Sequence, residues 1–379
     1  MITLLRQSSG GVAVSDAYLI LANGAVFKGK QFGYDGEAVG ELVFSTGMTG
    51  YLETLSDPAY FGQIVLQTFP LVGNYGVIPQ DFGTGPVHLR AYIVREWCQE
   101  PSNFRSEGNL DSFLREHKTP GLFDIDTRQL TRVIRSSGVM NAMVSKTPEL
   151  TEDQWVMLRG YRITDAIAAV NAKNSEFRIP NSEFSGGRAD PFRCREQELG
   201  MVSNIIVWDF GCASRMTELL AANRCAPVIV GHNATAEEIS RQNPVGVVLS
   251  GGPGDPAENT RIIGEIKKLC EMNIPILAVG LGHQMLALAQ GAKTEKLPFG
   301  HRGANQPVRQ KETGHAFVTA QNHGYTVTPA SLPENAVISY ENLSDGTCEG
   351  IDYSDFPAFS IQFDLTDDIF AKFLLVVKK

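Results

Sequence analysis

Residues Ile274-Pro-Ile-Leu-Ala-Val-Gly-Leu-Gly-His-Gln-Met285 decide the fold of the second half of the chain. The apolar run 275–279 predicts a buried strand, and residues 283–290 predict a helix that Gly291 closes. A tight strand-to-helix turn is typical of a nucleophile elbow, which aims backbone N–H groups at a developing oxyanion. The tip of such a turn should hold Ser or Cys, but here it is Gly280, which has no side chain. By itself, the segment also fits an ordinary glycine-rich turn.

Short apolar runs alternate with helical segments on both sides of this turn. Runs of buried strands alternating with helices indicate a mostly parallel sheet covered on both faces, a doubly wound α/β domain. Ligands of such domains bind at the carboxyl ends of the strands. The predicted strands are 204–209, 227–230, 245–250 and 275–279, and the predicted helices are 215–223, 235–241, 258–271 and 283–290.

The amino-terminal half is predicted to be β-rich. Residues 16–30 alternate apolar and polar side chains around Asn23-Gly24, which indicates a hairpin. Further strands are expected at 41–44 and 63–69, and helices at 109–117 and 126–135, the latter capped by Asp126 or Thr127.

Composition sets the expected domain boundaries. Asn, Ser, Arg, Pro and Gly are frequent between residues 171 and 199, where periodicity is weak, so this stretch is interpreted as a linker. The expected organisation is a leader at 1–15, an N-terminal domain at 16–170, a linker at 171–202 and a second domain at 203–379. The leader lacks the apolar core of a secretory signal.

Charge and cysteine usage exclude several classes of protein. The net charge of -9 argues against a nucleic-acid or anionic-membrane partner. No apolar stretch approaches the roughly 20 residues of a membrane-spanning helix. The six cysteines have neither CxxC spacing nor companion histidines, so no metal site, cofactor or disulfide framework is expected, and a reducing cytoplasm fits best. They are Cys98, Cys194, Cys212, Cys225, Cys270 and Cys348.

Several segments carry a family resemblance. Leu249-Ser-Gly-Gly-Pro-Gly-Asp-Pro256 and Thr319-Ala-Gln-Asn-His-Gly-Tyr325 flank the elbow and are similar to signature segments of class I glutamine amidotransferases. Four amino-terminal segments resemble the small subunit of carbamoyl phosphate synthetase, and the resemblance runs from Asp16 to Gln362. These are Phe44-Ser-Thr-Gly-Met-Thr-Gly-Tyr51, Asp57-Pro-Ala-Tyr60, Pro70-Leu-Val-Gly-Asn-Tyr-Gly76 and Asp124-Ile-Asp-Thr-Arg-Gln-Leu-Thr-Arg132.

The resemblance implies a glutaminase with a Cys-His-Glu triad, whose ammonia travels through a tunnel to a large subunit that uses ATP and bicarbonate. A thiolate attacks the amide, a histidine activates the thiol, and a carboxylate orients the histidine. This chain departs from that pattern at all three positions. The family's nucleophile falls on Gly280. Its His-Pro-Glu triplet follows a strand that is expected here at 358–363, but Asp364-Leu-Thr-Asp-Asp-Ile-Phe370 comes next, and no histidine follows His323.

Other positions match residues that hold glutamine in the family. The resemblance implies glutamine contacts from Gly47, Gly252, Gly254, Leu281, Gln284, Asn322, Gly324 and Tyr325. Glycines serve such a site because backbone amides can approach the ligand closely. Some family members carry a serine at the position of Gly47, which puts that contact in doubt. Ala213 and Arg215 stand where the family usually has a lysine and an asparagine after Asp209-Phe-Gly.

Three groups of residues are candidate substitutes for the triad. His283 is interpreted mainly as a helix-start or packing residue, and His323 mainly as a structural residue of its motif. Asp364, Asp367 and Asp368 are interpreted as a solvated cluster at a helix start. None of these residues supplies a nucleophile.

The leading functional hypothesis is a catalytically silent homologue, a structural or regulatory partner of the ammonia-using large subunit. One alternative is an active glutaminase subunit that supplies carbamoyl phosphate synthesis in the pyrimidine and arginine pathways, with a triad rebuilt from other residues. A second alternative is a glutamine-binding sensor. An engineered or damaged copy of an active gene also stays open. The expected partners are the large subunit and the candidate ligand glutamine, with no nucleic acid and no membrane.

Overall fold

The computed structural model describes residues 15–81, 86–177, 202–223 and 225–377. These residues form two compact units. The first contains 15–43, 63–78 and 90–162, and the second contains 44–62, 79–81, 86–89 and the described residues from 163 onward. Nearly all of the predicted leader and most of the predicted linker, with Cys194, lie outside the described residues. The predicted linker begins inside helix α5 (Ala166–Phe177).

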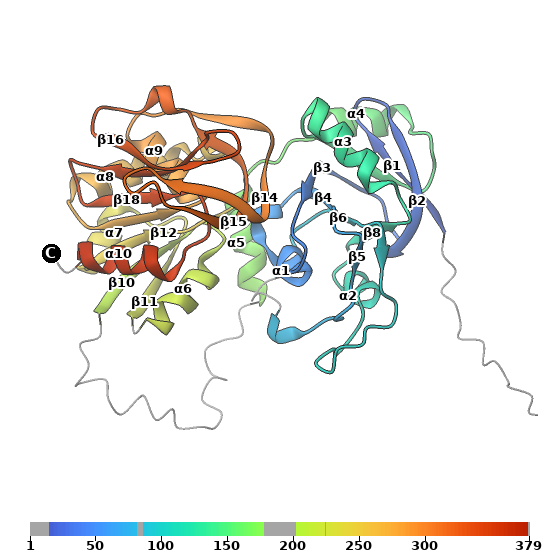
Figure 1. The fold of residues 1–379 in the computed structure, drawn as a ribbon, viewed down its shortest axis with the longest axis horizontal. Coiled ribbons are helices and arrows are strands. Elements are labelled where there is room, and N and C mark those ends of the chain that lie inside the picture. The colour runs from blue at the N-terminus through green and yellow to red at the C-terminus, as the bar shows by residue number, and fades with distance from the viewer. Residues whose placement is uncertain (1–14, 82–85, 178–201, 224, 378–379) are drawn as a thin grey trace, which may run out of the picture. The chain divides into compact units, whose positions relative to one another are not determined.

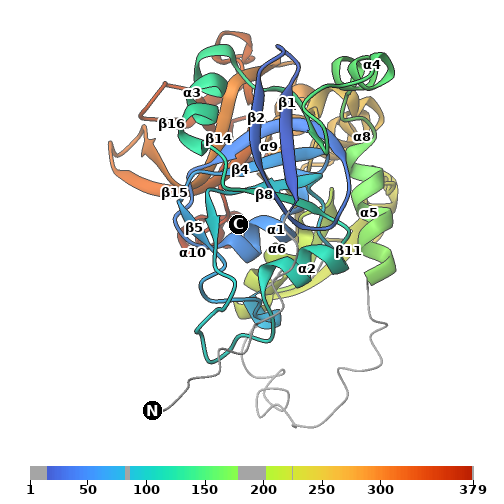
Figure 2. The same ribbon diagram turned by 90° about the vertical axis from the view of Figure 1, so that its right-hand side faces the viewer.

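The first unit is built on a closed β-barrel (Figures 1 and 2). The predicted hairpin is confirmed, because β1 and β2 pair antiparallel across Gly24, whose φ is 91°. Around the barrel the strands follow the order β1 (Asp16–Leu21), β2 (Val26–Gly33), β8 (Pro120–Phe123), β6 (Ala91–Ile93), β4 (Gln63–Gln67), β3 (Ala38–Ser45) and β9 (Met140–Ser145). Strands β5 (Leu71–Val72) and β7 (Glu96–Trp97) form a separate pair.

The helices of the first unit begin at polar caps. The Asn109 side chain accepts the Ser112 N–H at the start of α2 (Leu110–Glu116). Asp126, and not Thr127, caps α3 (Thr127–Ser137) by accepting the Gln129 N–H. Both predicted helices are therefore confirmed at their amino ends, where a side-chain oxygen satisfies an orphan backbone donor. A third helix, α4 (Glu152–Gly160), begins with a capping box.

The second unit contains a nine-stranded sheet in the order β11-β10-β12-β13-β18-β17-β16-β14-β15. The first five strands are parallel, as the sequence predicts, because β10 pairs with β11 and β12, and β13 pairs with β12 and β18. The last four strands pair antiparallel and are not predicted. The parallel strands are β10 (Val202–Asp209), β11 (Cys225–Gly231), β12 (Gly246–Leu249), β13 (Ile276–Val279) and β18 (Ala358–Ile361).

Both faces of the parallel half are covered, which confirms the doubly wound architecture (Figure 1). Ile206 and Trp208 face one core and Ile205 and Val207 the other, because side chains alternate along a strand. The first core includes residues from α7 (Ala236–Ser240), α8 (Thr260–Glu271) and α9 (Leu281–Ala289). The second includes residues from α6 (Ala213–Ala222) and α10 (Asp367–Val377).

The antiparallel half consists of β14 (Thr294–Gln310), β15 (Ala316–Val327), β16 (Ala336–Asn342) and β17 (Cys348–Tyr353). The second unit also takes two short helical segments from the amino-terminal half of the chain, α1 (Tyr51–Ser56) and η1 (Pro58–Tyr60).

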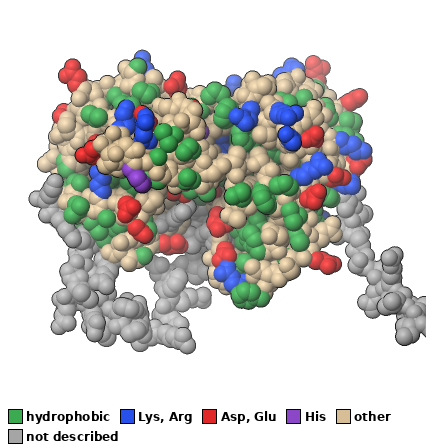
Figure 3. All heavy atoms as spheres, in the orientation of Figure 1, with side chains coloured by type: hydrophobic (Ala, Val, Ile, Leu, Met, Phe, Trp, Pro, Cys, Tyr) green, Lys and Arg blue, Asp and Glu red, His purple; other side chains and the backbone are tan. Residues whose placement is uncertain are grey.

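Within the described residues, no helix has the length and apolar character needed to cross a bilayer. On the face drawn in Figure 3, acidic and basic side chains lie interspersed.

Candidate functional site

The turn between β13 and α9 has the strained backbone of an elbow. Gly280 has φ 55° and ψ -114°, a conformation that L residues rarely adopt. Its N–H donates to Ile361 O at 2.9 Å, and the Gly282 N–H donates to Ser250 O at 3.1 Å. Among the described residues, a Cβ added to Gly280 would have only Gly251 Cα within 4 Å, at 3.5 Å. The backbone is therefore set up to present a side chain, and space for its first carbon is available.

Two predicted binding glycines follow β12, and both are required by packing. A Cβ on Gly252 would lie 2.3 Å from Phe210 O and 3.0 Å from Leu281 Cδ2. Gly254 has φ 94°, and a Cβ there would lie 2.9 Å from Ala166 Cβ. The loop thus packs closely against the ends of β10, α9 and α5.

A Gly252→Ala variant is expected to lose about 1–3 kcal/mol of unfolding free energy, since the new methyl group would collide with a backbone carbonyl that cannot turn aside. Gly264→Ala is the matched control. Gly264 lies in α8 with open space around it, so the same substitution should stabilise by about 0.5–1 kcal/mol. Urea denaturation measures both. Equal effects at the two positions would contradict the packing argument.

Gln284 links the start of α9 to β15 and to the residue that follows β18. Its Nε2 donates to Tyr325 O at 2.7 Å and to Gln362 Oε1 at 2.8 Å, and the side chain is buried. Gly252, Leu281, Gln284 and Tyr325 are therefore brought together around the elbow. The Gln284 amide nitrogen is engaged within the protein.

The other predicted residues lie on the β14–β15 ladder or, for Gly47, in the segment after β3 that contacts it. Gly47 follows Thr46, whose N–H donates to Arg302 O at 3.1 Å. Asn322 is the register partner of Arg302, and its Nδ2 donates to Asp57 Oδ2 at 2.6 Å. Gly324 lies beside Arg302, because a Cβ there would be 3.1 Å from its Nη2.

Asp57 is a site residue that the sequence reasoning missed as an individual residue. It precedes η1, where its carboxylate also accepts the Ala59 N–H at 2.9 Å. The Asp57-Pro pair of the quoted motif is the signal that could have identified it, since Asp before Pro commonly caps a short helical turn.

Cys212 lies beside the loop that follows β12. Its N–H donates to Gly251 O at 3.2 Å, and a Cβ on Gly251 would lie 3.6 Å from Cys212 Cβ. Burial raises the pKa of this thiol well above its ordinary value, and the nearby Asp57, Asp209 and Asp364 carboxylates raise it further. Thiolates are stabilised by cationic neighbours, so this environment keeps Cys212 protonated and poorly nucleophilic.

The surroundings of His283 and His323 disfavour a role as a general base for either residue. His283 Nδ1 lies 2.7 Å from Ser360 Oγ, and burial lowers the pKa of His283 to about 3. His323 Nδ1 lies 2.8 Å from Tyr325 O, and burial, together with the charge on His301, lowers the pKa of His323 well below its ordinary value. Both imidazoles are neutral, and each has a ring nitrogen engaged by the protein.

The neutral state of His283 makes stability depend on pH. Its pKa of about 3 lies below the ordinary 6.5, so stability present above pH 6.5 is lost as pH falls toward 3. Within this window, His283 alone should remove about 1.4 kcal/mol of unfolding free energy per pH unit. Urea denaturation of the wild type and His283→Gln between pH 7 and about pH 5 tests this, since the wild-type slope should be steeper. Parallel profiles would contradict it.

The segment after β18 contains carboxylates in place of a histidine. The Asp364 N–H donates to Ala320 O at 3.0 Å. The negative charge of its carboxylate adds to the effect of burial in raising the pKa values of Cys212 and Tyr60. Asp367 and Asp368 form the first turn of α10 and are exposed, which agrees with a helix-start role. Ala213 is the first residue of α6, and Arg215 also lies in α6.

Comparisons with known proteins match both halves of the chain. Residues 19–144 match the family model "Carbamoyl-phosphate synthase small chain, CPSase domain", and residues 206–364 match "Glutamine amidotransferase class-I". A carbamoyl phosphate synthase small chain of Clostridium perfringens is 41% identical, over 92% of this chain and 93% of the relative. A pyrimidine-specific small chain of Bacillus subtilis is 40% identical, over 91% and 89%.

Similar solved structures are also found. A glutamine amidotransferase of Thermotoga maritima is 18% identical, with a TM-score of 0.36, and the match covers 47% of this chain and 83% of that one.

Proposed function

The chain belongs to the carbamoyl phosphate synthase small chain family, and from this premise we propose that it is a member unable to hydrolyse glutamine. Its role is that of a structural or regulatory partner of a large subunit that runs on free ammonia. The carbamoyl phosphate so formed would enter pyrimidine or arginine synthesis. The observation that carries the proposal is the bare turn at Gly280, where the amide of glutamine would have to be attacked.

Chemistry at this turn needs an attacking atom and a base. Covalent amide hydrolysis uses a thiol or hydroxyl activated by an adjacent base. Gly280 offers neither, and burial raises the pKa of the neighbouring Cys212 thiol, with a further contribution from three nearby carboxylates. His283 and His323 are neutral and hydrogen-bonded elsewhere. These features support a silent site better than a rebuilt one.

What the chain retains is the backbone framework of an amidotransferase. The elbow, the close-packed loop at Gly252 and the Gln284–Tyr325 link are all present. A protein that has lost its reactive side chains but kept this framework still offers a folded partner. This supports a role in assembly with the large subunit, rather than a loss of all function.

The test is a reconstitution with the cognate large subunit. The two chains are expected to co-purify and to form carbamoyl phosphate from ammonium chloride and not from glutamine. The control is the same large subunit with an intact small chain. A glutamine-dependent rate within about tenfold of that control would overturn the silent assignment. Failure to co-purify would remove the partner role.

A second candidate function is a glutamine sensor, favoured by the arrangement of Gly252, Leu281, Gln284 and Tyr325 around the elbow. Glutamine would be captured there and not cleaved. Calorimetric titration with glutamine tests this, with glutamate and asparagine as matched controls. Binding that Asn322→Ala weakens supports a sensor. No heat and no thermal shift with glutamine would remove it.

A further inference from the structure

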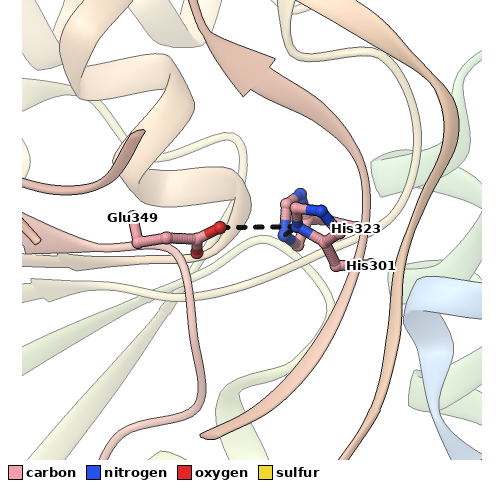
Figure 4. Close-up of side chains that lie close together, drawn as sticks. All are labelled: His301, His323 and Glu349. Atoms are coloured by element: carbon pink, nitrogen blue, oxygen red, sulfur yellow. Dashed lines mark hydrogen bonds and ion pairs between the residues drawn. The ribbon is translucent and has the colours of Figure 1, made fainter. Parts of the chain in front are cut away.

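Three buried side chains that can bind a metal converge in the antiparallel half of the second unit (Figure 4). His301 on β14 and His323 on β15 are cross-strand partners, and Glu349 lies on β17. His301 Nδ1 is 3.3 Å from His323 Nε2 and 3.4 Å from Glu349 Oε1. Figure 4 shows the carboxylate of Glu349 directed at the two rings.

The outer nitrogen of each imidazole is held by an acceptor. His301 Nε2 lies 2.9 Å from Asp345 Oδ2, and His323 Nδ1 lies 2.8 Å from Tyr325 O. A carbonyl or carboxylate oxygen accepts a hydrogen, so His301 Nε2 carries an N–H, and His323 Nδ1 carries one in the tautomer that leaves its Nε2 free to bind an ion. In that tautomer the inner nitrogens, His301 Nδ1 and His323 Nε2, both offer lone pairs and lie 3.3 Å apart. Metal-binding histidines typically have this second hydrogen bond, which fixes the tautomer and orients the ring.

Further acceptors face the same point. Gln321 Oε1 lies 2.9 Å from His323 Nε2. The orientation of this amide follows from its Nε2, which donates to Thr319 Oγ1 at 3.0 Å, while that hydroxyl donates to Gln306 O. Glu349 is fully buried, and its Oε2 has no hydrogen-bond partner among the described residues. Glu349 Oε1 accepts the Thr347 hydroxyl at 3.1 Å, so Oε2 is the carboxylate oxygen that is buried without a donor, and a bound cation would offset the cost of that burial.

We propose that His301, His323 and Glu349 form a binding site for a divalent transition-metal ion, with Zn²⁺ as the best match. Zn²⁺ binds imidazole nitrogen and carboxylate oxygen at about 2.0–2.1 Å in a tetrahedron, so its ligand atoms lie roughly 3.3–3.4 Å apart. The two separations that involve His301 Nδ1 are 3.3 and 3.4 Å, and all three ligand atoms lie within 4.8 Å of one another. Gln321 Oε1 or a water completes the coordination. Imidazole donors disfavour Ca²⁺ and Mg²⁺.

The ion would act as a structural tie. It would join three strands, β14, β15 and β17, through the side chains of His301, His323 and Glu349. Asp345 is partly exposed, with 42% of its side chain accessible, and lies next to His301 at the outer side of the cluster, which gives an entry path. The site requires neither glutamine nor a nucleophile at Gly280, so it is independent of the proposed loss of glutaminase activity.

A proton is the rival occupant of the cluster. Burial lowers the pKa of His301, but hydrogen bonds and charge from Asp345 and Glu349 outweigh this effect and raise the pKa to about 9. A protonated His301 would then bridge the two carboxylates without any metal. The experiment must distinguish these two occupants.

Cobalt is the probe, because tetrahedral Co²⁺ has intense visible absorption bands and a six-coordinate ion has weak ones. The full chain is stripped with chelator and titrated with Co²⁺. We expect one equivalent to bind with a tetrahedral spectrum and to be displaced by Zn²⁺, which should also raise the thermal midpoint. Asp345→Asn should weaken the affinity by about 10–100-fold, because the second hydrogen bond is weakened.

Glu349→Gln should abolish the tetrahedral spectrum and still fold, since its amide oxygen can accept the Thr347 hydroxyl that now lies 3.1 Å from Glu349 Oε1. Circular dichroism checks the fold. His315→Asn, at an exposed histidine, is the matched control and should bind Co²⁺ as the wild type does. The proposal is overturned by a six-coordinate spectrum, by equal binding in Glu349→Gln and wild type, or by no binding to folded wild type, which would leave the protonated His301 as the occupant.

Discussion

The Gly280→Cys variant is expected to fold and yet to remain without glutaminase activity. In subtilisin, loss of the activating histidine slows turnover by on the order of 10⁶-fold, and a similar deficit is expected for this variant. A new thiol at the turn would have room for its Cβ. It would lack a base, because His283 is hydrogen-bonded to Ser360 and His323 to Tyr325.

Ammonia release from glutamine by the variant, alone and with the large subunit, measures this outcome. Gly280→Ala is the matched control, because it carries the same backbone strain without sulfur. Both variants should lose about 1–3 kcal/mol of unfolding free energy, since a side chain is forced into a φ of 55°. Ammonia release by Gly280→Cys several orders of magnitude above Gly280→Ala would reveal an active base that the hydrogen bonds do not indicate.

The Phe373→Ala variant is expected to lose about 3–5 kcal/mol of unfolding free energy, the largest of the expected stability effects. Phe373 is fully buried on α10 and belongs to the core that includes Val248 and Leu277. Its ring packs on Gly246, where an added Cβ would lie 2.7 Å from the ring Cζ. Glycine at the start of β12 thus makes room for this ring, and removing the ring leaves a cavity.

Leu375→Ala on the same helix is the control. Leu375 is 65% exposed, so its truncation should change the unfolding free energy by no more than about 0.5 kcal/mol. Chemical denaturation followed by circular dichroism compares the two variants with the wild type. Similar losses for both would show that helix propensity, and not core packing, controls the effect of the substitution.

The parallel half of the large sheet could be predicted from the sequence, and the antiparallel half could not. Strands such as β12 and β13 are buried on both faces and read as continuous apolar runs. In contrast, β14 mixes exposed and buried residues without a period of two, and its pairing with β15 shifts register between Lys296 and His301. Bulges of this kind erase the alternation that identifies a strand.

The candidate site was predictable only where it coincides with local motifs. Gly252, Leu281 and Gln284 lie in contiguous segments around the elbow, so the sequence could indicate them together. The hydrogen bond from Asn322 to Asp57 joins residues 265 positions apart, and His301 and Asp345 are 44 apart. Metal-ligand spacing rules examine short separations, so the His301, His323 and Glu349 cluster has no signature in the sequence.

The membership of residues 44–62 in the second unit has a consequence for how the protein is made. This early segment leaves the ribosome long before its partners, such as Arg302 and Asn322, have been synthesised. The second unit therefore cannot complete its fold until translation is nearly finished. For the same reason, a gene fragment starting at residue 203 would encode the large sheet without Asp57, which accepts from Asn322, and without the rest of residues 44–62.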